Sequence, residues 1–375
     1  MQIPNGLLFS KRYLSVIAVW VLASLCFSVQ VFAQAPPAPC SGIGAGASDA
    51  LLQLSLKDTR AVFHQGEIIT LQLAFTSKSK GKYHMDTRTS GQNGRVTRES
   101  FCLDPVAGSD PLADYFGAGT FSLDETRVAQ PPSAVFQTQT PSAGNTILKR
   151  HPFRLDLDLN EWKSLPPGTY HLVLETQRIS QVTPTGEQVP VLVRSNAIQF
   201  QVMDADPSWQ EAQLTAAITA LDTGASEEAR HAARVLRFLG TEAATHELVN
   251  RYWSLNRQLN GWNLMFGLVG SPHRDMAIQE MRNAISDPQH PITRDFLRTL
   301  ALLEAASDPQ FKAASNAAQT SDEFMQAQQQ ESAVIDKLVN QHLAELSSVA
   351  PQKTGNALKV SMETLNQGRN MAALQ

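Results

Sequence analysis

Hydrophobic residues recur at every second position in several short runs between residues 49 and 203. One run places Ile69, Leu71, Leu73 and Phe75 two positions apart, which predicts a strand with one buried face. The same period appears in the segments 51–56, 153–159, 170–174, 189–193 and 198–202. Six or seven such strands, separated by turn residues, predict an antiparallel β-sandwich over residues 49–203.

The hydrophobic period changes within the segment Gln201 to Glu211, QVMDADPSWQE. After it, apolar residues recur every three to four positions, as in amphipathic helices. Ser208 and Glu211 have the spacing of a capping box, which predicts that a helix begins here. We therefore predict a helical domain over residues 204–375.

Apolar stripes and caps predict the helices that follow. We expect the first to end near Gly224, the second to end at Gly240, and Thr241 to cap the third. A long helix should run from Thr320 to about Ser347, and a final one over residues 355–370. The stripes of the first two helices are Leu214, Ile218 and Leu221, then Ala229, Ala232, Leu236 and Leu239.

A short motif repeats in the helical region. Ser286-Asp287-Pro288-Gln289 returns 21 positions later as Ser307-Asp308-Pro309-Gln310, with one helix's worth of apolar spacing between the two copies. Repeated helices with such turns are typical of an α-solenoid. The segment 227–249, EEARHAARVLRFLGTEAATHELV, resembles a HEAT repeat in its Ala-rich packing positions, its Arg and its short turn. The resemblance covers residues 205–305, and the Ala- and Gln-rich segment 312–331 interrupts it.

A turn in the strand region carries a second resemblance. Leu165-Pro166-Pro167-Gly168-Thr169-Tyr170 predicts a rigid turn before a strand whose tyrosine hydroxyl caps the sheet corner. The stretch resembles the PGxY motif of bacterial immunoglobulin-like modules. The fold class is therefore expected to be multidomain β + α, an immunoglobulin-like β-sandwich followed by a HEAT-like α-solenoid. This pairing resembles uncharacterised exported bacterial proteins, and it says little about function.

Residues 1–33 have the layout of a secretory signal peptide. Lys11 and Arg12 precede an uncharged, mostly apolar run over residues 13–27, and Ala33 provides a small residue at the cleavage position. The alternative is an uncleaved membrane anchor, because the run approaches the roughly 20 residues that span a bilayer. Residues 34–48, uncharged and rich in Pro, Gly and Ala, should form a flexible linker. We expect an exported protein in the periplasm, at the cell surface or secreted.

Net charge and cysteine content limit the class of partner and the disulfides that we expect. Removal of residues 1–33 leaves 29 of 31 basic residues against 35 acidic ones and changes the net charge from −4 to −6. Such a chain does not attract phosphate backbones, so we do not expect nucleic acid as a partner. Cys26 leaves with the signal. A disulfide between Cys40 and Cys102 is then expected, and two separate thiols are the alternative.

The strand region contains a long loop, residues 103–146, and loops of this length are usually functional or disordered. Asp104, Asp110 and Asp114 lie close together in it, but their spacing fits no standard calcium loop. We expect them to start turns. The neighbouring aromatic residues, Tyr115 among them, are expected to pack the loop onto the sheet.

No complete catalytic motif is found in the sequence. The segment His246-Glu247-Leu248-Val249-Asn250 has Asn where a zinc protease helix needs its second His. The segment 42–46, GIGAG, has no strand before it as a phosphate loop requires. We therefore expect no enzyme, no cofactor and no metal. A hydrolase without a recognisable motif is the third alternative.

Binding is the expected work of the protein, because a solenoid offers an extended face to a partner. Trp, Tyr and Arg often anchor interfaces, although aromatic residues of helical repeats also form cores. We expect a non-catalytic adaptor for a protein or peptide, with a structural envelope or cell-surface scaffold as the alternative. Membrane contact is expected only through an uncleaved signal segment, and the oligomeric state is open. The candidate binding residues are Trp209, Arg251, Tyr252, Trp253, Arg257 and Trp262.

Overall fold

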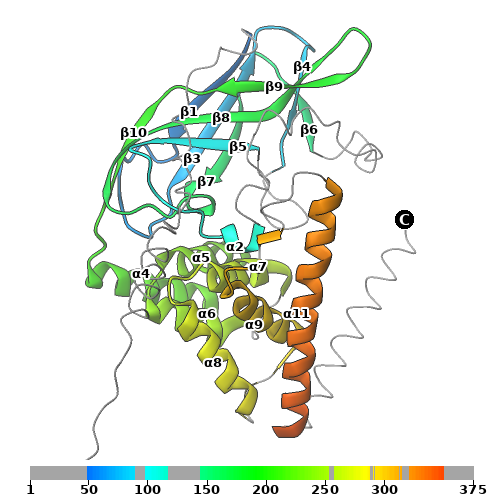
Figure 1. Ribbon diagram of the computed structural model, residues 1–375. Coiled ribbons are helices and arrows are strands. Elements are labelled where there is room, and N and C mark those ends of the chain that lie inside the picture. Colours follow the sequence, from blue (N-terminus) through cyan, green and yellow to red (C-terminus); the bar gives the residue numbers. More distant parts are fainter. Residues whose placement is uncertain are drawn as a thin grey trace, which may run out of the picture. The chain divides into compact units, whose positions relative to one another are not determined.

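The computed structural model describes residues 49–88, 98–116, 144–252, 257–287, 290, 292–311, 313–314 and 321–349. All of these belong to one compact unit, Gly42–Gln375. The predicted signal peptide, the linker, Cys40 and the predicted final helix lie outside the described residues. Strands come first along the chain and helices follow (Figure 1).

The first sheet has the order β1-β3-β7, with antiparallel neighbours. Its strands are β1 (Ala50–Leu56), β3 (Thr70–Ser77) and β7 (Phe153–Asp158). Leu54 lies opposite Leu73, and Leu73 lies opposite Leu155. All three side chains are buried, so the predicted alternation gives this sheet its apolar face.

The second sheet is organised around the long strand β8, as Figure 1 shows. The first part of β8 pairs with β10 and β5, and its second part pairs with β9 and β4. β2 lies parallel to β10, and β6 lies antiparallel to β4. The strands are β2 (Val62–His64), β4 (Tyr83–Asp86), β5 (Glu99–Asp104), β6 (Asn145–Ile147), β8 (Gly168–Val182), β9 (Gln188–Arg194) and β10 (Ile198–Met203).

The two sheets share one hydrophobic core, which combines Leu71, Leu73 and Phe75 of the first sheet with Tyr170 and Phe200 of the second. The hydroxyl group of Tyr170 donates a hydrogen bond to the carbonyl oxygen of Pro166 at 2.7 Å. The predicted capping of the sheet corner by this tyrosine is therefore confirmed.

The helices follow the predicted change of period, and consecutive or next-but-one helices contact each other. They share a second hydrophobic core. Within the described residues they are α4 (Pro207–Thr223), α5 (Ser226–Leu239), α6 (Glu242–Tyr252), α7 (Arg257–Val269), α8 (Arg274–Ser286), α9 (Arg294–Ala306) and α11 (Ser321–Val349). No helix of this part of the chain is both long and apolar enough to cross a membrane.

Most predicted helix ends are confirmed. Gly224 is the C-cap of α4, and Gly240 ends α5 with a positive φ of 65°, a conformation that glycine adopts without strain. The Oγ1 atom of Thr241 accepts a hydrogen bond from the backbone N–H of Ala244 at 3.1 Å. The long helix α11 runs from Ser321 to Val349, close to the predicted helix from Thr320 to about Ser347.

The predicted capping box at the start of α4 is wrong. Asp206 is the N-cap, and its carboxylate accepts a hydrogen bond from the backbone N–H of Trp209 at 2.9 Å. Ser208 instead lies inside the first turn and donates its hydroxyl to Asp206 at 2.6 Å. Pro207 explains the earlier start, because proline at the first helical position has the required φ and needs no donor.

Two arginines of α5 join the helices to the strand region. Arg234 contacts Asp158 at the end of β7, with 2.6 Å between Nη1 and Oδ2. Arg237 donates two hydrogen bonds, of 2.8 and 2.5 Å, to Glu161 in the short 3-10 helix η2 (Leu159–Glu161). Its side chain is only 4% exposed. Such a bidentate pair fixes orientation as well as distance.

The described start of the long loop packs against helices, whereas we expected Tyr115 to pack it onto the sheet. Tyr115 lies in the short helix α2 (Ala113–Phe116), and its ring lies edge-on to Phe266 of α7 at 5.3 Å. Leu112 is fully buried in the helical core, and Asp114 pairs with Arg274 of α8 at 2.7 Å. The helical core thus offers the apolar partners for this loop.

Candidate functional site

A groove of about 490 Å³ lies between α4 and α5. Four of the nine residues that line it are alanines, here called its alanine floor, and two of these, Ala217 and Ala232, are buried. Polar groups stand among these alanines. The lining residues are Gln213, Ala216, Ala217, Ala220, Glu227, Glu228, His231, Ala232 and Val235.

The two walls of the groove differ in charge. The α4 wall has no charged residue over positions 212–221, AQLTAAITAL. The α5 wall begins with Glu227 and Glu228, which stabilise the positive end of the helix dipole. Glu228 also accepts a hydrogen bond from the backbone N–H of Ala225 at 2.9 Å, and Glu227 pairs with Arg230. The groove therefore combines an apolar wall with carboxylates at one end.

His231 adds a titratable group to the groove. Partial burial lowers its pKa, and the nearby Arg234 lowers this pKa further, whereas Asp158 raises it. His231 is therefore neutral at pH 7, with one ring nitrogen able to donate a hydrogen bond and the other able to accept one. Such a side chain suits a peptide group, which has one donor and one acceptor.

The sequence motifs examined for chemistry occupy structural positions. The Nδ1 atom of His246 lies 3.0 Å from Glu280, and its Nε2 atom lies 2.9 Å from Asn250, on an exposed helix surface. Asp110 accepts a hydrogen bond from the backbone of Leu112 at 2.9 Å, as a turn residue does. Over the described ranges, no group of three or more His, Cys, Asp or Glu side chains is placed to hold a metal ion.

Three predicted binding residues make contacts within the protein. Trp209 stacks on His64 of β2, with 4.5 Å between the ring centroids. Arg251 donates to Asp222 at 2.5 and 3.1 Å and also pairs with Glu247. The hydroxyl groups of Tyr252 and Thr299 lie 2.7 Å apart. These contacts hold elements of the protein together.

The other three predicted binding residues lie at or after the end of α6. Trp262 on α7 is 51% exposed and lies 5.6 Å from Phe266. Arg257 begins α7, but its side chain lies outside the described part, and so does Trp253 altogether. The described candidates are therefore spread over three helices, and none of them lines the α4–α5 groove.

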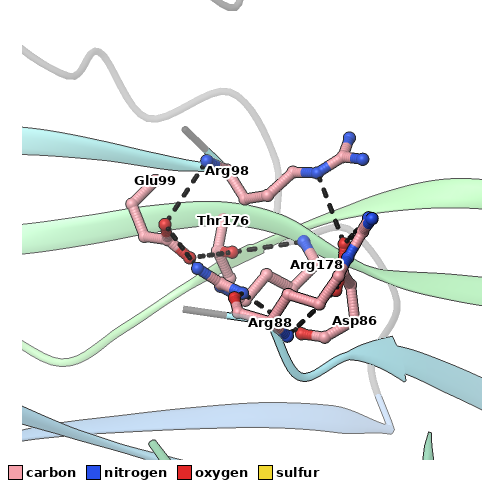
Figure 2. A network of polar contacts seen from close by, with 6 residues as sticks. All are labelled: Asp86, Arg88, Arg98, Glu99, Thr176 and Arg178. Atoms are coloured by element: carbon pink, nitrogen blue, oxygen red, sulfur yellow. Dashed lines mark hydrogen bonds and ion pairs between the residues drawn. The ribbon is translucent and has the colours of Figure 1, made fainter. Parts of the chain in front are cut away.

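Sequence reasoning missed a network of buried charge in the second sheet, drawn in Figure 2. Arg178 of β8 pairs with Glu99 of β5, and both side chains are fully buried. Arg178 also donates to the carbonyl oxygens of Asp86 at 3.2 Å and Arg88 at 2.5 Å. One guanidinium thereby joins β8 to β5 and to the end of β4.

The rest of the network surrounds Asp86. Burial raises the pKa of this carboxyl, but hydrogen bonds from Arg88, at 2.9 and 2.6 Å, outweigh burial and leave the pKa lowered. Arg98 adds a weaker contact at 3.7 Å. Dashed lines in Figure 2 connect each of these charged side chains to another one, so the network links the strands of the sheet.

A break in the strand period could have revealed this network. Arg178 and Ile179 are adjacent and both buried, which regular alternation forbids. The pairing of β8 with β9 shifts register between Thr176 and Ile179, as at a β-bulge. Bulges redirect a side chain in this way.

Cys102 on β5 is disulfide-bonded. Its predicted partner, Cys40, lies outside the described residues, so that pairing stays a prediction.

Comparisons with known proteins identify no family for this chain. No protein-family model matches the chain, and no curated protein matches it. Among solved structures, a chain named pT26-6p is similar at 10% sequence identity with a TM-score of 0.19. The alignment covers 82% of this chain and 51% of that one, so this chain spans about half the length of that protein. A TM-score this low supports no statement about fold or function.

Proposed function

We propose that the protein is an exported adaptor that binds an apolar segment of another protein through its helical region. The observation that carries this proposal is the groove between α4 and α5. Its alanine floor accepts apolar side chains, and Gln213 and His231 supply hydrogen bonds for a peptide backbone. A Lys or Arg in the bound segment would face Glu228.

The finer fold assignment belongs to the same proposal. We propose that the two sheets form an immunoglobulin-like β-sandwich, which their shared core and the Tyr170 corner support. The ordered contacts from α4 to α9 support a HEAT-like array, with α9 lying between the two Ser-Asp-Pro-Gln motifs of the sequence. In such an array each helix pair adds one step of an extended surface.

The joints between strands and helices support the adaptor role. Arg237 and Glu161 fix α5, one wall of the groove, relative to the strand region. The Trp209–His64 stack fixes the start of α4, the other wall. A groove held at both walls is preorganised, which reduces the entropy cost of binding a partner.

The test is site-specific photo-crosslinking in cells that produce the full chain. A photoreactive amino acid replaces Gln213 in the groove, and mass spectrometry identifies what is captured. One recurrent partner, crosslinked through an apolar segment, supports the adaptor. Self-crosslinks alone, together with sedimentation with the envelope, would favour the scaffold alternative and contradict the proposal.

A further inference from the structure

The helix α11 is joined to two other helices through a single carboxylate. Glu304 of α9 accepts a hydrogen bond from Arg282 of α8 at Oε1, at 2.8 Å. Its Oε2 atom lies 2.8 Å from the Nε2 atom of His342 on α11. Both oxygens of Glu304 are therefore engaged, and its side chain is only 10% exposed.

His342 lies between two carboxylates. Its Nε2 atom contacts Glu304, and its Nδ1 atom lies 3.6 Å from Glu345, one turn further along α11. A neutral imidazole has a proton on only one ring nitrogen, so only the imidazolium directs an N–H towards both carboxylates. His342 is 8% exposed and the Glu304 side chain 10%, so water screens this pair weakly, whereas the Glu345 side chain is 58% exposed and its charge is screened more strongly.

The charges that face this joint come from every helix packed against it. α8 contributes Arg282 and α9 contributes Glu304, whereas α11 itself contributes Glu345. Further along the same interface, Arg298 of α9 pairs with Asp336 of α11 at 3.1 Å, and both side chains are about half exposed. His342 is the histidine of this described set, and histidine is the side chain whose ordinary pKa lies between about pH 5 and pH 8.

We propose that α11 is a pH-sensitive latch, which protonated His342 fastens onto α9 and which loosens when this histidine loses its proton. The apolar residues Ile335, Val339 and Leu346 hold the helix in both states, because all three belong to the helical core. The proton therefore changes how often α11 opens, whereas the position of α11 on the helical core stays the same. This inference is independent of the proposed partner groove.

The pH range follows from the two partners. The hydrogen bond to Glu304 raises the pKa of His342 above its ordinary value of 6.5. The stabilisation of α11 by protonated His342 is complete below about pH 6.5 and is lost as pH rises through the folded-state pKa of this histidine. Burial raises the pKa of Glu304, but His342 and Arg282 outweigh it and lower this pKa below 4.5. The stabilisation contributed by ionised Glu304 is complete above about pH 4.5. The latch is therefore fastened between about pH 4.5 and pH 6.5.

Amide hydrogen exchange of the full chain tests the latch. After correction for intrinsic rates, the helix around the amides of residues 327–346 should open about fivefold more often at about pH 8 than at about pH 5.5. This is the ratio expected when the hydrogen bond from His342 to Glu304 weakens from a charged donor to a neutral one. The variant His342→Gln, which keeps a donor but does not titrate, should lose this dependence. Equal opening at the two pH values in the unaltered protein would overturn the proposal.

The matched control is His246→Gln. His246 also contacts a glutamate, Glu280 at 3.0 Å, but its side chain is 56% exposed and joins α6 to α8. This variant should keep the pH dependence of α11, and loss of it would contradict the latch. If His342→Gln does not fold, NMR titration of the His342 ring in the unaltered protein decides. A pKa at or below 6.5 would overturn the proposal.

Discussion

Single residues carry charge into the interior of this protein where the strand pattern would place apolar ones. The side chains of Arg178 and Glu99 are both fully buried, and the two residues lie 79 positions apart in the sequence. A buried pair whose partners satisfy one another is tolerated, whereas removal of one partner leaves an uncompensated charge. The network thus makes the stability of the second sheet depend on a few side chains.

Replacement of Arg178 by Ala should lower the free energy of unfolding by about 3–5 kcal/mol, because Glu99 would remain buried without its partner. Urea unfolding followed by circular dichroism measures the change. The matched control is Lys57→Ala, which breaks an exposed pair with Asp156 at 2.8 Å and should cost less than about 1 kcal/mol. Equal costs for the two variants would contradict the structural role of the network.

The start of α4 gives a prediction at the scale of the element. Asp206→Ala removes the side chain that accepts from the backbone N–H of Trp209 and should lower the unfolding temperature. Ser208→Ala should lower it less, because Ser208 only donates to Asp206. Thermal unfolding of both variants checks this order. A larger loss of stability for Ser208→Ala would instead support the predicted capping box.

The elements show which local signals the sequence carries. Period-two runs predicted β3 and β7 because each buries an apolar face over six or more residues. β2, β4 and β6 are three or four residues long, too short for a period, and they form by pairing with distant strands. The helices after residue 206 were predictable because caps and glycines are local features.

The candidate groove was less predictable than the elements that form it. Of its alanines only Ala232 was predicted as a packing position, and the sequence does not show that a groove forms beside Ala216 and Ala220. Of the predicted aromatic and arginine residues, Trp209, Arg251 and Tyr252 instead make contacts inside the protein. Tyr252, for example, contacts Thr299, which lies 47 residues further along the chain. Such pairings depend on tertiary structure and leave no local pattern.

At the scale of the whole molecule, Arg237 joins the strand region to the helices. Arg237→Ala would remove two hydrogen bonds to Glu161 and the contact of the guanidinium with the Phe266 ring at 5.0 Å. We expect strands and helices to unfold separately in this variant and together in the unaltered protein. Calorimetry measures the number of unfolding transitions in each protein. A single transition in the variant, merely shifted in temperature, would contradict coupling through this pair.

The most direct test of partner binding compares two tryptophan substitutions on α4. Ala216 lines the groove and Ala212 does not, although both are exposed on the same helix. The measurement is the yield of the partner crosslinked from position 213 in each folded variant. Ala216→Trp should fill the groove and abolish the crosslink, whereas Ala212→Trp should keep it. Equal yields from the two variants would contradict binding in the groove.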